Sequence, residues 1–378
     1  MEGVVLALGV CLILALVTKR FTLPAIPFYI IGGLVIGETG FKLVEASPVS
    51  DFLTRLGLLF LLFFMGLEIK PSRIWSNKSS ILTSGLLDLV FNVALGLVAA
   101  LALGFPLAEA SIIAAAFFIS STAMAVTSLI ENHKLLMPEA ETIVWLMVFE
   151  DIVLIIILSV IGASPEHPVL VVAKMAAVIL FIWAIGRYGR NQLTQALTRD
   201  DELPALLTFT IVIIVAYFSE GIGIPDTFMV IAAGVMLGSV NAPSFERHAR
   251  PFKDVFLVVF FVFFGITVQF AGEASLVAIV LICIVAVVSK FISGVVIGRV
   301  VHGKAVSGIE IWTNTIGRGE FSIAIAALYG SAIVSGVIAV MVIVTSILGA
   351  FASQYSGILL EIWKRPVRPP PTLILEPE

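Results

Sequence analysis

Charged residues are scarce in this sequence. Asp, Glu, Lys and Arg make up 13% of the 378 residues, whereas soluble domains average about 25%. Hydrophobic residues make up 60%, more than a soluble core needs. They form successive apolar runs of about 18 to 25 residues, long enough to cross a hydrocarbon layer about 30 Å thick. The composition therefore predicts an all-α polytopic membrane protein whose solvent is the lipid bilayer.

Cysteine and histidine are also rare. Cys11 and Cys283 both lie inside apolar runs, which indicates neither a disulfide framework nor a metal cluster. The four histidines fall in predicted loops without HExxH spacing, and the sequence has no Walker A phosphate loop. These absences argue against a metal hydrolase and against direct use of ATP. We therefore expect no enzyme activity and no cofactor, with an ion gradient as the driving force, and nothing indicates a nucleic acid partner.

Charge clusters, prolines and polar turns divide the chain into about thirteen predicted spans. They begin near Gly3, Leu23, Asp51, Ser80, Ala108, Glu139, Pro168, Leu203, Pro225, Pro251, Ala274, Val306 and Ser331. The first run has no basic leader and no small-residue cleavage site, so we expect it to be a retained span. The proline-rich segment 364–378 is expected to be a short cytoplasmic tail.

The basic residues are distributed unequally between the two sides of the predicted membrane. Seventeen of the 22 Lys and Arg residues fall in loops that alternate onto one side, against Lys42 and Arg55 on the other. Because positive residues are enriched on the cytoplasmic side, this predicts a cytoplasmic C-terminus and an external N-terminus. We expect the protein in the cell membrane.

Two of the predicted spans contain polar interruptions. Span five contains Phe118-Ile-Ser-Ser-Thr-Ala123, and span twelve contains Thr313-Asn-Thr-Ile-Gly-Arg-Gly-Glu320. Thirteen spans divide as 6+1+6, which gives two halves of opposite orientation, and paired breaks in such an inverted repeat point to a transport site. The alternative is ordinary back-bonding by Ser and Thr with close packing at the glycines.

The sixth predicted span carries two adjacent acids, Glu150 and Asp151, and the eleventh carries Lys290. A charge at mid-bilayer costs about 2.5 to 3.5 kcal/mol even on a lenient scale, so each needs a partner or a function. Adjacent helical residues point about 100° apart, so the two carboxylates take different directions. We assign Asp151 to the ion pathway, binding either Na+ or K+ or a proton, with Lys290 as its salt-bridge partner. Glu150 is either a second titrating group or a structural partner of Arg318.

Other charges inside predicted spans are Arg318, Glu320 and Asp88. Arg318 and Glu320 follow the break in span twelve, where charges of opposite sign neutralise helix ends; a gating role is the other interpretation. Asp88, with Asn92 one turn later, either lines the ion path or hydrogen-bonds across helices, and we favour the second. A network of salt bridges that only holds helices together is the alternative for the whole set.

A set of short stretches, taken in order and spacing, resembles the monovalent cation/proton antiporter family (CPA2), with its Kef-type potassium efflux systems and NapA-type sodium/proton antiporters. The stretches are 31–37 (IGGLVIG), 61–68 (LLFFMGLE), 120–123 (SSTA), 149–152 (FEDI), 260–266 (FFVFFGI), 289–290 (SK) and 317–321 (GRGEF).

This resemblance implies an antiporter fold of the NhaA and NapA type with two crossing broken helices, and a homodimer. A dimerisation part would comprise about 1–75 and 203–270, a core part about 80–162 and 274–360, and a linker helix about 168–187. The core would carry the ion by an elevator-like movement. The cytoplasmic nucleotide-binding domain of Kef-type proteins has no counterpart here, so any such regulation is expected from a separate subunit.

The resemblance also implies roles for individual residues. Asp151 matches the family's ion-binding aspartate and Lys290 its lysine partner. It implies that Ser121 and Thr122 line the crossing. Ser120, Thr313 and Asn314 belong to the same polar interruptions, and we expect them to line the broken helices as well. NapA-type members have Asp and Kef-type members Gln where this chain has Glu150. A second titrating carboxylate there would permit two protons per cation.

The function expected from these observations is secondary-active exchange of a monovalent cation for protons. A passive cation channel using the same broken helices is one alternative. A transport-inactive membrane scaffold or sensor, in which the acids only link helices, is the other.

Overall fold

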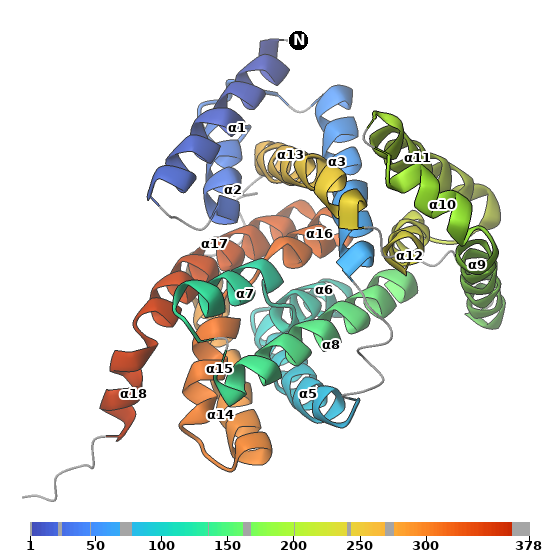
Figure 1. Ribbon diagram of the computed structural model, residues 1–378. Coiled ribbons are helices and arrows are strands. Elements are labelled where there is room, and N and C mark those ends of the chain that lie inside the picture. Colours follow the sequence, from blue (N-terminus) through green and yellow to red (C-terminus); the bar gives the residue numbers. More distant parts are fainter. Residues whose placement is uncertain are drawn as a thin grey trace, which may run out of the picture.

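The computed structural model describes residues 2–21, 25–45, 47–68, 78–134, 136–161, 168–199, 201–239, 243–268 and 276–364. The predicted tail beyond Lys364 lies outside these residues. Within them the regular secondary structure is helical, and the helices pack in two groups (Figure 1).

The first group is drawn in the upper part of Figure 1 and centres on α3, which packs against both α12 and α13. Its helices are α1 (Glu2–Phe21), α2 (Ala25–Ile36), α3 (Pro48–Glu68), α11 (Leu203–Ile222), α12 (Asp226–Ser239) and α13 (Pro243–Thr267). Two helices at its edge, α9 (Pro168–Tyr188) and α10 (Arg190–Leu197), connect it along the chain to the second group.

The second group is drawn in the lower part and centres on the contact between α5 and α14. Its helices are α5 (Lys78–Ala102), α6 (Leu107–Phe118), α7 (Thr122–Glu131), α8 (Pro138–Ile161), α14 (Leu276–His302), α15 (Ser307–Thr315), α16 (Glu320–Tyr329), α17 (Ala332–Gln354) and α18 (Ser356–Lys364).

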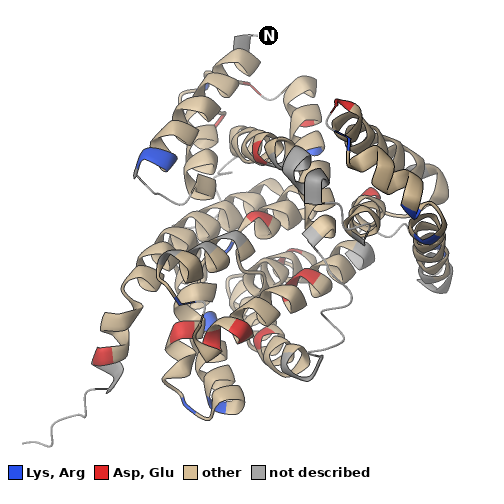
Figure 2. Ribbon diagram, viewed as in Figure 1, with Lys and Arg blue, Asp and Glu red and all other residues tan. Residues whose placement is uncertain are grey.

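Helical structure throughout is what a bilayer requires, because only helices and closed barrels satisfy every backbone group in hydrocarbon. In the described part of the chain, α1, α3, α5, α14 and α17 are each long and apolar enough to cross a membrane. Charged positions occupy little of the ribbon, most of which is uncharged (Figure 2). The chain is therefore an integral membrane protein, as its composition predicts.

One helix begins before the predicted start of its span. We expected a span from about Pro251, and the apolar stretch of α13 runs from Asp254 to Thr267. The helix itself begins at Pro243 and contains Pro251 in its interior. A proline inside a helix removes one backbone donor, and here the helix continues past it.

Glycine allows the helices of the first group to approach closely at two places. A Cβ atom added to Gly33 on α2 would lie 2.2 Å from the carbonyl oxygen of Val262 on α13 and 2.8 Å from the Cα of Gly265. A Cβ atom on Gly66 of α3 would lie 3.0 Å from the Cα of Gly234 on α12. In lipid the hydrophobic effect does not drive helices together, so small residues favour helix association by allowing close van der Waals packing of the backbones.

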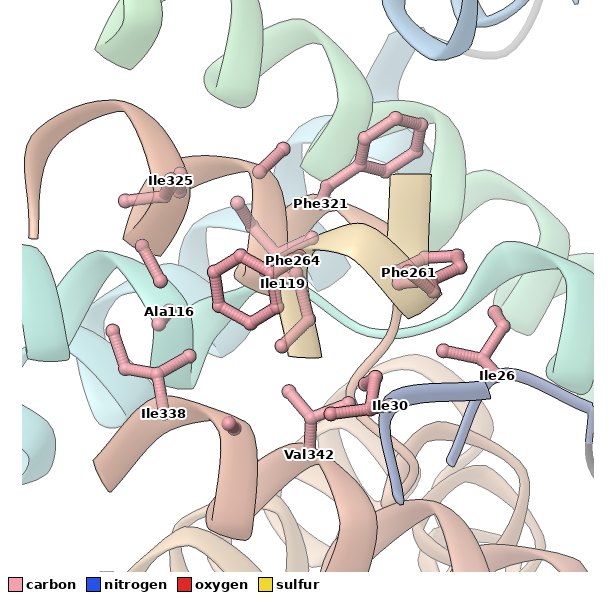
Figure 3. Close-up of a cluster of buried hydrophobic side chains, with 14 of the residues drawn as sticks. Ile26, Ile30, Ala116, Ile119, Phe261, Phe264, Phe321, Ile325, Ile338 and Val342 are labelled. Carbon is pink, nitrogen blue, oxygen red and sulfur yellow. The ribbon is translucent and has the colours of Figure 1, made fainter. Parts of the chain in front are cut away.

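The two groups of helices meet through hydrocarbon side chains (Figure 3). Ile26 and Ile30 of α2 and Phe261 and Phe264 of α13 lie on one side of this contact. The other side is formed by side chains of α6, α16 and α17, with Ile119 of the α6–α7 connection; those labelled are Ala116, Phe321, Ile325, Ile338 and Val342. The side chains labelled at this contact between the groups are therefore all apolar.

Replacing Gly33 with Ala tests the close approach of α2 and α13. Overpacking of this kind costs about 1–3 kcal/mol, so the apparent Tm in detergent should fall by several degrees. Gly9→Ala on α1 is the control, because its added Cβ would meet nothing within 4 Å. Equal Tm values for the two variants would contradict the packing described here.

Candidate ion site at the helix crossing

Two pairs of half-helices, α6–α7 and α15–α16, are interrupted at the polar segments that the sequence singles out. The interruptions touch: Ser120 and Arg318 form an isolated antiparallel β-bridge, and the backbone N–H of Ser121 donates to the Gly317 carbonyl at 2.8 Å. A Cβ atom on Gly319 would lie 2.5 Å from the Cβ of Ser121, so only glycine fits there. The breaks therefore satisfy part of each other's freed backbone.

Positively charged side chains lie at the carboxyl ends of the interrupted helices. The fully buried Arg318 donates from Nε to the Phe117 carbonyl at 3.0 Å and from Nη1 to the Ile316 carbonyl at 2.8 Å. Its Nη2 donates to the Ala286 carbonyl of α14 at 2.9 Å. Lys290 adds a bond from Nζ to the Phe118 carbonyl at 2.9 Å. Positive charge stabilises the negative ends of α6 and α15.

Acids occupy the amino ends of the other two half-helices. The Glu150 carboxylate accepts from the backbone N–H of Ser120 and, at 3.0 Å, from its hydroxyl, just before α7 begins. Glu320 is the first residue of α16, and its Oε2 accepts from the Ser121 hydroxyl at 3.2 Å. Negative charge at helix amino ends is the favourable arrangement. The four charges thus match the four helix ends at the crossing.

Lys290 lies between two carboxylates. Its Nζ is 2.8 Å from Glu150 Oε1 and 2.6 Å from Asp88 Oδ2. All three residues are buried. We expected Lys290 to face Asp151, and this pairing needs correction, because the structure sets Glu150 and Asp88 against the ammonium. The turn of α8 that aims Glu150 at the crossing rotates the next residue about 100° away, and Asp151 is partly exposed.

The remaining predicted lining residues lie on the half-helices themselves. Asn314 accepts from the Ser128 hydroxyl of α7 at 2.7 Å, and Thr313 donates to the Glu310 carbonyl of its own helix at 3.2 Å. Both are buried one turn before the break. Thr122, at the start of α7, is partly exposed. The structure therefore places Ser120 and Ser121 at the crossing, with Thr313 and Asn314 where α15 packs on α7.

Sequence reasoning missed a second buried ion pair. Lys134 Nζ lies 2.8 Å from Glu310 Oε2 and also contacts the Ser356 hydroxyl, which donates to Glu310 Oε1 at 3.0 Å. This cluster links the α7–α8 connection, α15 and the start of α18. Lys134 is one of the seventeen basic residues that we predicted to lie in loops, which hid its partner. An acid in an otherwise apolar predicted span, Glu310, was the signal available.

The polar side chains of α17 that hold the break in span twelve were also missed. The Thr345 hydroxyl accepts from the Arg318 backbone N–H at 3.2 Å, and the Ser346 hydroxyl donates to the Arg318 carbonyl at 2.5 Å. Isolated Ser and Thr in apolar helices usually bond within their own helix, so this role had no clear signal in the sequence.

A cavity of about 480 Å³ opens between the two helix groups. Asp51 and Arg55 of α3 and Asp226 of α12 line it, and Arg55 and Asp226 form an ion pair at 2.9 Å. Gly330 and Ser335 line it from the second group. The sequence predicts these helix ends to be external, and none of the lining residues is one of the four charged side chains of the crossing.

Known proteins resemble this chain in sequence or in fold. A model of the family described as sodium/hydrogen exchanger, transmembrane, matches residues 5–354. The K(+)/H(+) antiporter subunit KhtU of Bacillus subtilis is 27% identical over 98% of this chain and 99% of its own. The ammonium/H(+) antiporter subunit AmhT of Alkalihalophilus pseudofirmus is 23% identical over 92% of each. The sodium proton antiporter MjNhaP1 of Methanocaldococcus jannaschii has the same fold, with a TM-score of 0.71 and 14% identity over 96% of this chain and 99% of its own.

The helical fold and the charged crossing define a membrane transporter rather than an enzyme. The chain belongs to the sodium/hydrogen exchanger family, among the monovalent cation/proton antiporters. The family suggested by the short sequence stretches is thereby confirmed.

Replacing Arg318 with Lys tests the role of the guanidinium at the crossing. A lysine ammonium cannot reach carbonyls of three helical segments in one geometry, and each buried carbonyl left without a donor costs about 1–3 kcal/mol. We expect a clear drop in apparent Tm. Arg299→Lys, at an exposed position near the end of α14, should leave the Tm unchanged. A Tm for Arg318→Lys within error of the parent would refute this role.

Proposed function

We propose that this protein exchanges K+ or Na+ for protons by elevator-type alternating access, with Asp151 as the ion-binding carboxylate. One observation carries the proposal. Glu150 is buried in bonds to the helix crossing, while its neighbour Asp151 is only partly buried on the same helix. Of the two acids, Asp151 is therefore the one with access for an ion.

The chemistry of a carboxylate explains why binding at Asp151 would couple two ions. Hard cations prefer oxygen ligands, and a protonated carboxyl group is a much poorer cation ligand than a carboxylate. The cation and the proton then compete for the same group. If the site changes the side that it faces only when Asp151 holds a cation or a proton, the protein exchanges the two ions across the membrane.

The helix packing supports an inverted repeat. In an inverted repeat of this order, α2 corresponds to α12 and α3 corresponds to α13. The contact of α3 with α12 then corresponds to the contact of α13 with α2, and the first group contains both. In the second group, α5 packs on α6 and α8, and α14 packs on α15 and α17. Broken helices at the interface of such repeats are the usual place of a transport site.

The contact between the groups supports an elevator. The hydrocarbon surface of Figure 3 separates a first group, proposed as the dimerisation part of a homodimer, from a second group that contains the crossing. An apolar surface has few directional bonds to break when one side slides along the other. The cavity beside Arg55 and Asp226 would be the external entrance, with the N-terminus outside and the C-terminus in the cytoplasm of the cell.

The relatives inform the choice of ion and partner. KhtU is named for potassium, AmhT for ammonium and MjNhaP1 for sodium. KhtU and AmhT are both named as subunits, which supports a separate regulatory subunit here. Potassium is the first cation to test, because KhtU matches nearly the whole of both chains.

Replacing Asp151 with Asn in proteoliposomes tests the proposal. The parent should collapse an imposed pH gradient when K+, Na+ or ammonium is added and not when choline is added. Asp151→Asn should lower this rate to that of protein-free liposomes. Glu141→Gln on the same helix is the control, since Glu141 lies near its start and accepts from Trp145 Nε1.

Other results would favour the alternatives. Cation current without proton movement would identify a channel. Exchange that persists in Asp151→Asn would remove Asp151 from the site, and the absence of any cation-dependent response in the parent would support a scaffold or sensor.

A further inference from the structure

The two carboxylates that share Lys290 are held in different ways. Asp88 Oδ1 accepts from Asn92 Nδ2 at 2.9 Å and from the Ser293 hydroxyl at 2.7 Å, in addition to the Lys290 bond at Oδ2. These donors belong to α5 and α14, which pack along each other. Asp88 is therefore a fully bonded carboxylate on a rigid helix pair.

Glu150 is held by the crossing instead. Apart from Lys290, its donors are the backbone and hydroxyl of Ser120, in the interruption between α6 and α7. A rearrangement of the crossing would change the bonds of Glu150 to Ser120, whereas the bonds of Asp88 to Asn92 and Ser293 lie outside the crossing.

Charge balance makes the difference important. A buried cation left without a partner is strongly disfavoured. If Glu150 were the sole partner of Lys290, a proton on Glu150 would leave the ammonium unpaired. With Asp88 at 2.6 Å, Lys290 remains paired when Glu150 is neutral. The other cation at the crossing, Arg318, is committed to backbone carbonyls.

From this arrangement we infer that Asp88 is a positioning residue for the exchange. It keeps Lys290 charged and fixed, so that Glu150 can take up and release a second proton while Asp151 exchanges the first for the cation. The inference rests on the proposed antiport. The exchange is then electrogenic, because two protons move against one cation. This stoichiometry depends on Asp88 of α5, which need not touch the transported ion.

The test measures charge moved per cation transported. Solid-supported-membrane electrophysiology gives the charge, and a pH-sensitive dye with a cation flux assay gives the ions. The parent should move about one net charge per cation. Asp88→Asn should reduce this ratio toward zero while exchange continues, because Lys290 then has only Glu150 and holds it ionised. Glu150→Gln should give the same low ratio, and Asp88→Glu should restore it.

The controls separate this inference from folding and from the proposed function. Asp254→Asn, at an exposed position of α13, should match the parent. If Asp88→Asn cannot be purified, Ser293→Ala removes one donor to Asp88 without changing charge and should lower the ratio in part. A ratio near zero in the parent, or an unchanged ratio in the Asp88 and Ser293 variants, overturns the inference but leaves antiport standing. No exchange in the parent would instead refute the proposed function.

Discussion

The structure depends on one constraint: backbone groups freed inside a membrane must find partners within the protein. The two interrupted helices meet this constraint jointly. Each break pairs with the other through Ser120, Ser121, Gly317 and Arg318, and charged side chains complete the set. Lys290 and Arg318 bind carbonyls at the carboxyl ends of half-helices, and Glu150 binds an N–H at an amino end.

The same bonds that make the breaks tolerable place a polar region inside hydrocarbon. Under the proposed function, this region and the neighbouring Asp151 form the environment of the transported cation. The partly exposed Asp151 lies on the helix that supplies Glu150 to this region. Burial distinguishes these two neighbouring acids, and the bonds of Glu150 to Ser120 and Lys290 hold it at the crossing.

The other helix contacts are of two kinds, close backbone packing at glycine and packing of hydrocarbon side chains. Within the first group, Gly33 and Gly66 allow backbones to pack almost in contact, which gives a rigid unit. Between the groups, isoleucine and phenylalanine side chains form the apolar surface of Figure 3. Dispersion contacts of this kind are individually weak but many, so together they stabilise the contact between the two groups without directional bonds.

The sequence alone determined the membrane environment, the helical class, the two polar interruptions and the short list of buried charges, because hydropathy and the cost of charge in lipid act locally. The family followed from the order of its short stretches. Only the tertiary structure decided that Lys290 pairs with Glu150 and Asp88, that Arg318 binds carbonyls, and that Glu310 meets Lys134. Along the sequence, Lys290 is 140 residues from Glu150 and 202 residues from Asp88. Periodicity within one helix gives the direction of a side chain only relative to its neighbours. Which charges pair between helices depends on how the helices pack, and only the tertiary structure shows that packing.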